Sequence, residues 1–100
     1  MKRKYGKQHN EWRDKIRLKF DNKCIVCGES HLVAAHHLIP WEVEGFRHDP
    51  NNGILLCPKH HTKYSYGLSP HSDGAALFYI WLRRHHPKIM EWIEVNYYEI

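Results

Sequence analysis

The sequence predicts a small α+β fold in which two strands and a helix, a ββα unit, lie between helices at the two ends of the chain. Its 100 residues suit one domain with one modest core. Two short apolar segments bounded by turn residues, 31–39 and 53–56, predict the strands. Apolar residues at helical spacing before and after these segments predict the helices.

The first helix is predicted over residues 11–20. Trp12, Ile16 and Phe20 recur every four positions, which places them on one helix face, and Asn10 is a suitable N-cap. The polar residues 21–23 then predict a turn. The sequence CIVCG at 24–28 predicts a tight knuckle.

The ββα unit is predicted between residues 31 and 67. The segment HLVAAHHLI at 31–39 is apolar apart from its histidines and ends at Pro40, which favours a buried strand. A loop is expected over 41–51, and GILL at 53–56 predicts the second strand. Pro58 stands where a first helical residue would, so a helix is expected there, with Gly67 at its end.

Two more helices are expected near the C-terminus. One covers residues 73–86 and stops before Pro87, and the last is marked by apolar residues from Ile89 to Tyr97. We therefore predict a single domain, 1–100, made of three parts. These are a basic arm and helix (1–23), the ββα core (24–67) and the C-terminal helices (68–100).

The net charge of +4 is concentrated at the N-terminus. Residues 1–20 carry eight Lys or Arg against Glu11 and Asp14, a net of +6, which leaves about −2 for the rest. A basic leading segment on a nearly neutral body predicts a polyanionic partner, first of all nucleic acid, although it would also serve solubility alone.

Cysteine spacing predicts a structural zinc site. Cys24 and Cys27 form one C-x-x-C pair, and Cys57 and His60 form a second pair of the same spacing, so together they supply the ligands of a Cys₃His site. The 29 residues between the pairs exceed the usual zinc-ribbon spacing, so a strand must also lie there. Three cysteines cannot all pair with one another, which favours a reducing setting.

No segment approaches the roughly 20 apolar residues of a membrane span, and no apolar run follows the basic residues at the N-terminus. We therefore expect a cytoplasmic protein, in the host cytoplasm if the chain is phage-encoded, with no membrane partner and no small-molecule cofactor. Nothing in the sequence predicts an oligomeric state.

The adjacent histidines His60 and His61 are predicted to serve different sites. On a helix their side chains diverge by about 100°. Cys57 and His60, at i and i+3, share a face, which places His60 on the zinc and directs His61 elsewhere.

Three segments carry a resemblance to a known family: AHHLIP at 35–40, NGILLC at 52–57 and PKHH at 58–61. Over residues 24–65 the chain resembles the HNH endonucleases, zinc-bearing members of the ββα-metal nucleases. The family's first His lies three residues before a Pro, as His37 does before Pro40. Its Asn lies five residues before a zinc ligand, as Asn52 does before Cys57. Its last His directly follows the second ligand of that pair, as His61 does.

The resemblance implies divalent-metal-dependent hydrolysis of DNA. His37 is then the general base, while His36, where the family often has Asp, and His61 are ligands of the catalytic ion, which could be Mg²⁺, Mn²⁺, Ni²⁺ or Zn²⁺. Asn52 either orients His37 or completes the metal shell. Small proteins of this kind accompany phage packaging or restriction functions.

The chain departs from the family at two positions. Many members have a fourth Cys where this chain has His60. Colicin nuclease domains have a further His four residues after the last one, where this chain has Ser65.

Neighbouring strand residues face opposite ways, so His36 and His37 can flank one cleft only where the strand ends, which Pro40 favours. The histidines without motif spacing are expected at the surface or in turns: His9, His31, His48, His71, His85 and His86. Of these, His48 is the one placed to touch DNA.

The alternative function is a non-catalytic zinc-ribbon module that binds DNA. Such a module does not require His37, Asn52 and His61 at nuclease spacing. A zinc module for protein interaction would leave the basic leading segment unexplained.

Overall fold

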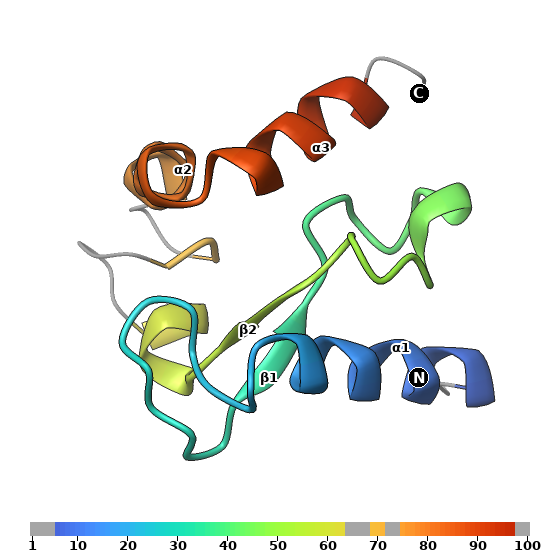
Figure 1. The fold of residues 1–100 in the computed structure, drawn as a ribbon, viewed down its shortest axis with the longest axis horizontal. Helices are drawn as coiled ribbons and strands as arrows, with labels where there is room; N and C mark the ends of the chain where they lie inside the picture. The colour runs from blue at the N-terminus through green and yellow to red at the C-terminus, as the bar shows by residue number, and fades with distance from the viewer. Residues whose placement is uncertain (1–5, 64–68, 72–74, 98–100) are drawn as a thin grey trace.

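The computed structural model describes residues 6–63, 69–71 and 75–97. A two-stranded antiparallel sheet, β1 (Ala34–His36) and β2 (Ile54–Leu56), lies at its centre. Helix α1 (Lys7–Lys19) lies on one side of the sheet, and α2 (Ala75–His85) and α3 (Pro87–Tyr97) lie on the other (Figure 1). The predicted small α+β fold is confirmed.

Strand β2 lies at the centre of the core. All three of its residues are fully buried, and they belong to one apolar cluster with Trp12 and Ile16 of α1 and Phe78 and Leu82 of α2. The sheet therefore buries apolar surface against helices from both ends of the chain, which is how so short a chain forms a core.

Helix α1 begins four residues earlier than predicted. Its N-cap is Gly6, which has no side chain to cap the helix, while Asn10 lies inside the first turns and is not the cap. The predicted buried face is confirmed by Trp12 and Ile16. A Cβ on Gly53 would lie 2.7 Å from Cδ1 of Ile16, so the close approach of α1 to the start of β2 requires glycine at that position.

The first strand is much shorter than the predicted 31–39. Leu32 has φ of 52°, so the chain turns there instead of running extended. Beyond His36 the chain leaves the sheet, because the backbone N–H and C=O of Ile39 bind the side chain of Asn52 and not β2. A strand of three residues remains, paired with β2 from Ala34 opposite Leu56 to His36 opposite Ile54.

The helix of the ββα unit follows β2 as predicted, after Pro58, but its geometry differs. Residues Lys59–Lys63, here η2, form a π-helix and not an α-helix. Gly67, the predicted end of this helix, lies outside the described residues. The expected loop 41–51 contains one short 3-10 turn, η1 (Glu44–Phe46).

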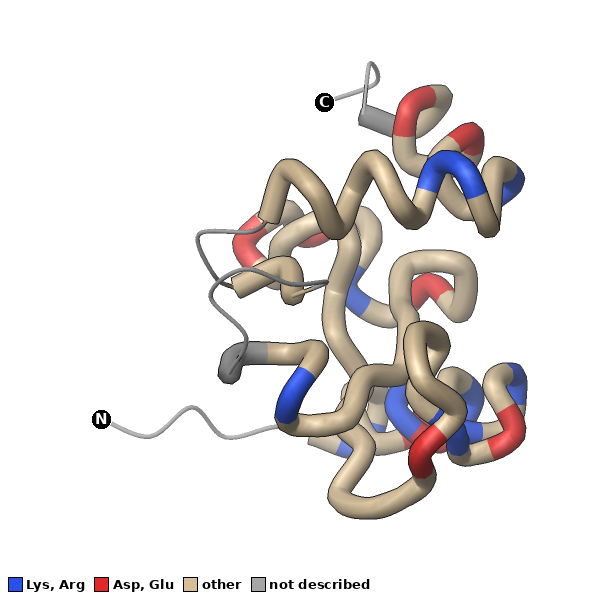
Figure 2. Tube along the Cα trace, turned by 90° about the vertical axis from the view of Figure 1, so that its left-hand side faces the viewer, with Lys and Arg blue, Asp and Glu red and all other residues tan. Residues whose placement is uncertain are grey.

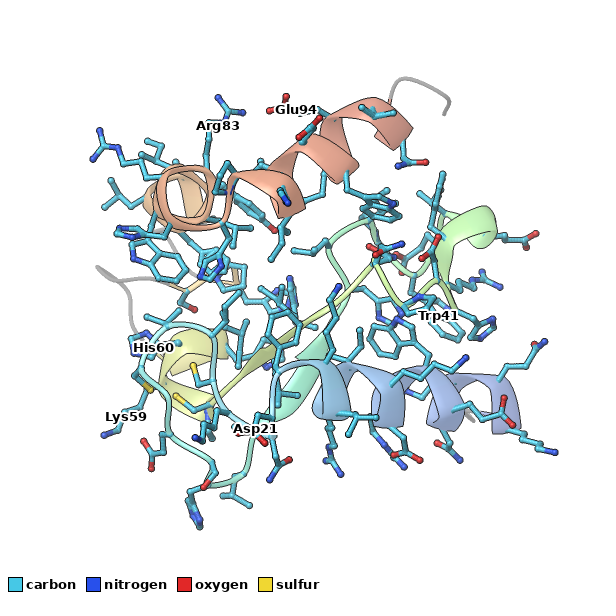
Figure 3. All side chains as sticks on the ribbon, in the orientation of Figure 1. Asp21, Trp41, Lys59, His60, Arg83 and Glu94 are labelled. Atoms are coloured by element: carbon cyan, nitrogen blue, oxygen red, sulfur yellow. The ribbon has the colours of Figure 1, made fainter. Side chains whose placement is uncertain are left out.

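The two C-terminal helices are confirmed. Helix α2 ends at His85, and Pro87 both stops it and opens α3, two residues before the predicted Ile89. Arg83 of α2 and Glu94 of α3 form an exposed ion pair of 2.7 Å across the hairpin (Figure 3). In the part of the chain that the structure describes, no helix is long and apolar enough to span a membrane.

Candidate active site and metal centres

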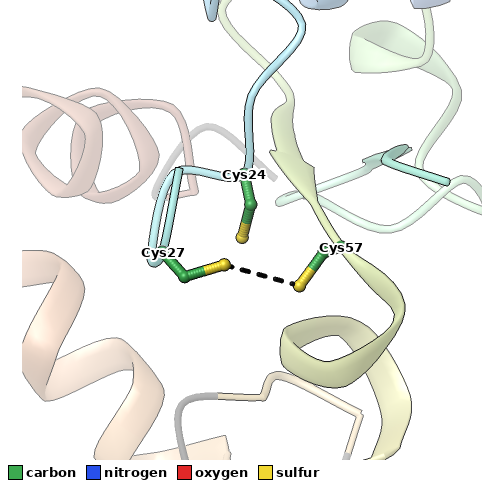
Figure 4. A group of neighbouring side chains, drawn as sticks. All are labelled: Cys24, Cys27 and Cys57. Carbon is green, nitrogen blue, oxygen red and sulfur yellow. Dashed lines mark hydrogen bonds between the residues drawn. The ribbon is translucent and has the colours of Figure 1, made fainter. Parts of the chain in front are cut away.

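Three cysteine side chains point toward one another where β2 ends (Figure 4). Their sulfurs all lie within 4.8 Å of one another, and those of Cys27 and Cys57 are 3.7 Å apart. The knuckle that carries Cys24 and Cys27 is closed by a 2.9 Å hydrogen bond from the N–H of Gly28 to the carbonyl of Cys24. Gly28 has φ of 78°, a value that favours glycine.

The surroundings of these sulfurs suit thiolates that share a cation. Burial acts to raise the pKa of the Cys24 thiol, but hydrogen bonds from the backbone of Cys57, Cys27 and Val26 outweigh it and lower the pKa. Desolvation of the Cys27 sulfur and its contacts with the other two sulfurs outweigh a hydrogen bond from the backbone of Glu29 and raise the pKa of Cys27 to about 11. A bound dication would compensate the negative charge of the sulfurs, so all three cysteines could be deprotonated together.

The fourth predicted zinc ligand, His60, is not among the ligand atoms that converge within 4.8 Å here, which come from the three cysteines. The prediction assumed an α-helix, in which His60 would lie directly over Cys57. In the π-helix the turn is wider, although the backbone N–H of His60 still bonds to the carbonyl of Cys57 at 3.1 Å. Figure 3 shows His60 at the end of the molecule where the sulfurs lie.

Three histidines form a second cluster: His36, His61 and His71. His36 ends β1 and His61 lies in η2, so the structure brings together the two residues predicted to bind the catalytic ion. Their ring centroids are 5.3 Å apart. The third ring, of His71, lies 4.7 Å from each of the other two centroids.

His71 was predicted to be a surface or turn residue. Its side chain is indeed exposed, but the prediction missed that His71 belongs to this cluster. The buried hydroxyl of Ser69 donates a 2.8 Å hydrogen bond to the carbonyl of His61, which holds the segment 69–71 against η2. No spacing in the sequence signals this contact. Ser65, which stands where colicin nucleases have their third His, lies outside the described residues.

The environment of His36 keeps its ring neutral. Burial, followed by the neighbouring charges of His71, His61 and His37, lowers its pKa to about 3. Burial, followed by the charge of His71, also lowers the pKa of His61. Nδ1 of His36 lies 3.1 Å from Nε2 of His71, while its own Nε2 is buried with no hydrogen-bond partner among the described residues. Neutral imidazoles that converge in this way offer lone pairs to a metal ion.

His37 directly follows the last residue of β1. Its side chain therefore need not point to the opposite face of the sheet from that of His36. It lines the same cleft as His36, His61 and His71, a cavity of about 380 Å³. Its Nε2 lies 2.9 Å from the carbonyl oxygen of Arg47. The adjacent histidines therefore flank one cleft, as expected where a strand ends.

Asn52 is fully buried and its amide binds backbone groups. Oδ1 accepts a 2.6 Å hydrogen bond from the N–H of Ile39, and Nδ2 donates to the carbonyls of Ile39 and Phe46, both at 2.9 Å. These bonds join the segment after His37 to the loop that carries Arg47. The amide of Asn52 thus connects the two backbone segments that lie on either side of the His37 ring.

One histidine outside the motif lies near His37, and another packs against Trp41. His9, on α1, has its ring centroid 6.0 Å from that of His37, and Trp41 lies 5.6 Å from His37. His48 packs edge-on against Trp41 at 5.9 Å. The first five residues of the predicted basic segment, which include Lys2, Arg3 and Lys4, lie outside the described residues.

Known proteins match the chain over this same region. A family model described as HNH endonuclease matches residues 24–68, which include the cysteine cluster and His36, His37, Asn52 and His61. The protein Anaredoxin from Nostoc sp. strain PCC 7120 is 37% identical over 68 residues, which are 67% of this chain and 88% of that protein. No solved structure matches the chain.

Proposed function

Because the chain belongs to the HNH endonuclease family, we propose that it hydrolyses phosphodiester bonds of DNA with the help of a divalent metal ion. The observation that carries the proposal is the arrangement around one cleft. His37 and the cluster of His36, His61 and His71 line the same cavity of about 380 Å³. A base and a set of metal ligands then face one bound phosphate.

His37 is the general base. A carbonyl oxygen can only accept a hydrogen bond, so the 2.9 Å contact with Arg47 places the proton of the neutral ring on Nε2. The lone pair is then on Nδ1, which takes the proton of the attacking water. Asn52 is a positioning residue, because it holds the carbonyl of Phe46 next to Arg47 and the backbone of Ile39 after His37.

The three imidazoles fit a divalent ion. Two nitrogens that bind one ion at about 2.1 Å each lie roughly 3 to 3.4 Å apart. Nδ1 of His36 and Nε2 of His71 are 3.1 Å apart, a distance that falls in this range. An ion held by His36, His61 and His71 would stabilise the negative charge that develops on the phosphate and on the leaving 3′ oxygen, giving 5′-phosphate and 3′-hydroxyl ends.

The cysteine cluster is the structural zinc site. Three thiolates suit Zn²⁺, and backbone N–H groups directed at Cys24 support a metal-bound sulfur. His60 is the fourth ligand, supported by its place one turn after Cys57 and at the same end of the molecule. The site joins the knuckle to the end of β2, next to the helix that carries His61.

The test is cleavage of supercoiled plasmid by the pure protein, without added ion and with Mg²⁺, Mn²⁺ or Ni²⁺. We expect nicked and linear DNA only when an ion is added. His31→Ala, which removes an exposed histidine away from the cleft, should cut at the wild-type rate. A folded protein that binds DNA but cuts it with none of these ions would instead be a non-catalytic DNA-binding module.

A further inference from the structure

A second cavity, of about 270 Å³, adjoins the cleft. His9, Arg13 and Arg17 of α1 line one side of it. His37 and Trp41 line the other side, and both also line the first cleft. The side chain of the proposed base therefore separates the histidine cluster from a space bordered by two arginines.

Among the described residues, the guanidinium of Arg13 has only a weak charged partner. Its Nε is buried and has no hydrogen-bond partner among the described residues. One terminal nitrogen lies 3.5 Å from Oδ1 of Asp14, an exposed contact that contributes little. A buried donor without an acceptor is costly, so an acceptor supplied by a ligand is expected here.

The lining of this cavity favours an anion. Arg17 lies one helical turn after Arg13 on the same face of α1, and no acidic side chain is among the described residues that line the space. In Figure 2, several Lys and Arg positions gather at the lower end of the molecule, together with Asp or Glu positions. The planar fork of a guanidinium matches the oxygens of a phosphate.

We propose that Arg13, supported by Arg17, binds the backbone phosphate that neighbours the cleaved one on the same DNA strand. The proposal rests on the nuclease function proposed above. A phosphate held in the second cavity fixes the strand beside His37, so that the next phosphate enters the cleft with the histidine cluster. This contact is local, unlike the general attraction exerted by a basic arm.

The experiment compares Arg13→Gln and Arg13→Lys with Lys15→Gln, which removes the same charge from an exposed position on the same helix. Single-turnover cleavage of supercoiled plasmid is measured with Mn²⁺ and saturating protein. Binding of a fluorescent 20-base-pair duplex is measured against salt. Thermal melting shows that each variant is folded.

We expect Arg13→Gln to slow cleavage at saturating protein by about tenfold or more and to reduce the salt slope of binding by about one. Arg13→Lys should restore the slope but not the full rate, because an ammonium lacks the fork. Lys15→Gln should leave the rate unchanged. A cleavage rate for Arg13→Gln equal to that of Lys15→Gln, or an equal salt slope for the two variants, would overturn the proposal.

The two proposals fail in different ways. If the wild-type protein cuts no DNA, the nuclease function fails, and the salt slopes still decide whether Arg13 binds a phosphate. If the wild-type protein cuts DNA and Arg13→Gln cuts at the same rate, the phosphate site fails and the nuclease function stands.

Discussion

The imidazole of His37 lies flat on the indole of Trp12, with ring centroids 3.8 Å apart and planes inclined by 10°. The indole Nε1–H donates a 3.0 Å hydrogen bond to the carbonyl of Asp49. Asp49 lies two residues after Arg47, whose carbonyl contacts the ring of His37. Helix α1 and the loop 41–51 thus fix the ring together. The face of an indole also attracts cations, so in the role proposed for His37 this stack would stabilise the ring once it had taken a proton.

Replacing Trp12 should separate the effect of its hydrogen bond to Asp49 from the effect of its stacking on His37. Trp12→Phe keeps an aromatic face but loses the hydrogen bond to Asp49, so we expect unfolding free energy to fall by about 1 kcal/mol and kcat to change little. Trp12→Leu loses the face as well and should lower kcat more than it raises KM. Equal kcat values for the two folded variants would show that stacking has no part in the reaction.

Asn52 should matter first for stability. Asn52→Asp cannot donate to the carbonyls of Ile39 and Phe46 and places a buried charge against them, so we expect a loss of about 3 kcal/mol or more in urea unfolding. Asn51→Asp, at the exposed neighbouring position, should cost little. Similar losses for both variants would contradict the role given to the Asn52 amide.

The local patterns of the sequence predicted most of the fold. The four-residue spacing of Trp12 and Ile16 identified the buried face of α1, and the apolar run at 54–56 identified β2. The first strand was predicted too long because its end depends on Asn52, which lies 13 positions after Ile39. A contact over such a distance in the chain leaves no mark on hydrophobic periodicity.

The candidate site was predicted in part. The motif spacing identified His36, His37 and His61, which the structure places around one cleft. His71 joins them through the contact of Ser69 with His61, which no local pattern encodes. The prediction that His60 shares a helix face with Cys57 assumed an α-helix. The spacing of apolar residues does not distinguish a π-helix from an α-helix, so the sequence did not reveal the difference.

The fold should depend on zinc. Cys57→Ser removes one of three converging thiolates at the end of the central strand, so we expect the variant to lose both its metal and its cooperative unfolding transition. Elemental analysis and circular dichroism measure the two losses. A Cys57→Ser protein that melts like the wild type, or a wild-type protein without tightly bound zinc, would contradict this prediction.

Stability should fall in mild acid because of His36. Burial, followed by the charges of the neighbouring histidines, lowers its pKa from 6.5 to about 3 in the folded protein. The unfolded chain therefore binds a proton that the folded chain excludes, and stability present above pH 6.5 is lost as the pH falls toward about 3.

Urea unfolding between pH 6.5 and 4.5, without added divalent ion, tests this linkage. His36→Gln has no group that titrates there, so its stability should fall less steeply than that of the wild type. Parallel curves for the two proteins would contradict the prediction.

Single-turnover cleavage of plasmid across a Mn²⁺ titration, by the wild type, His37→Ala and His71→Ala, tests the division of roles between base and metal ligands most directly. We expect His37→Ala to be slower by about 10² to 10⁴ at every Mn²⁺ concentration, because its proton acceptor is absent. We expect His71→Ala to be slow at low Mn²⁺ and to recover at high Mn²⁺, because it has lost only a ligand. Recovery of His37→Ala but not of His71→Ala, or wild-type rates for both, would contradict these roles.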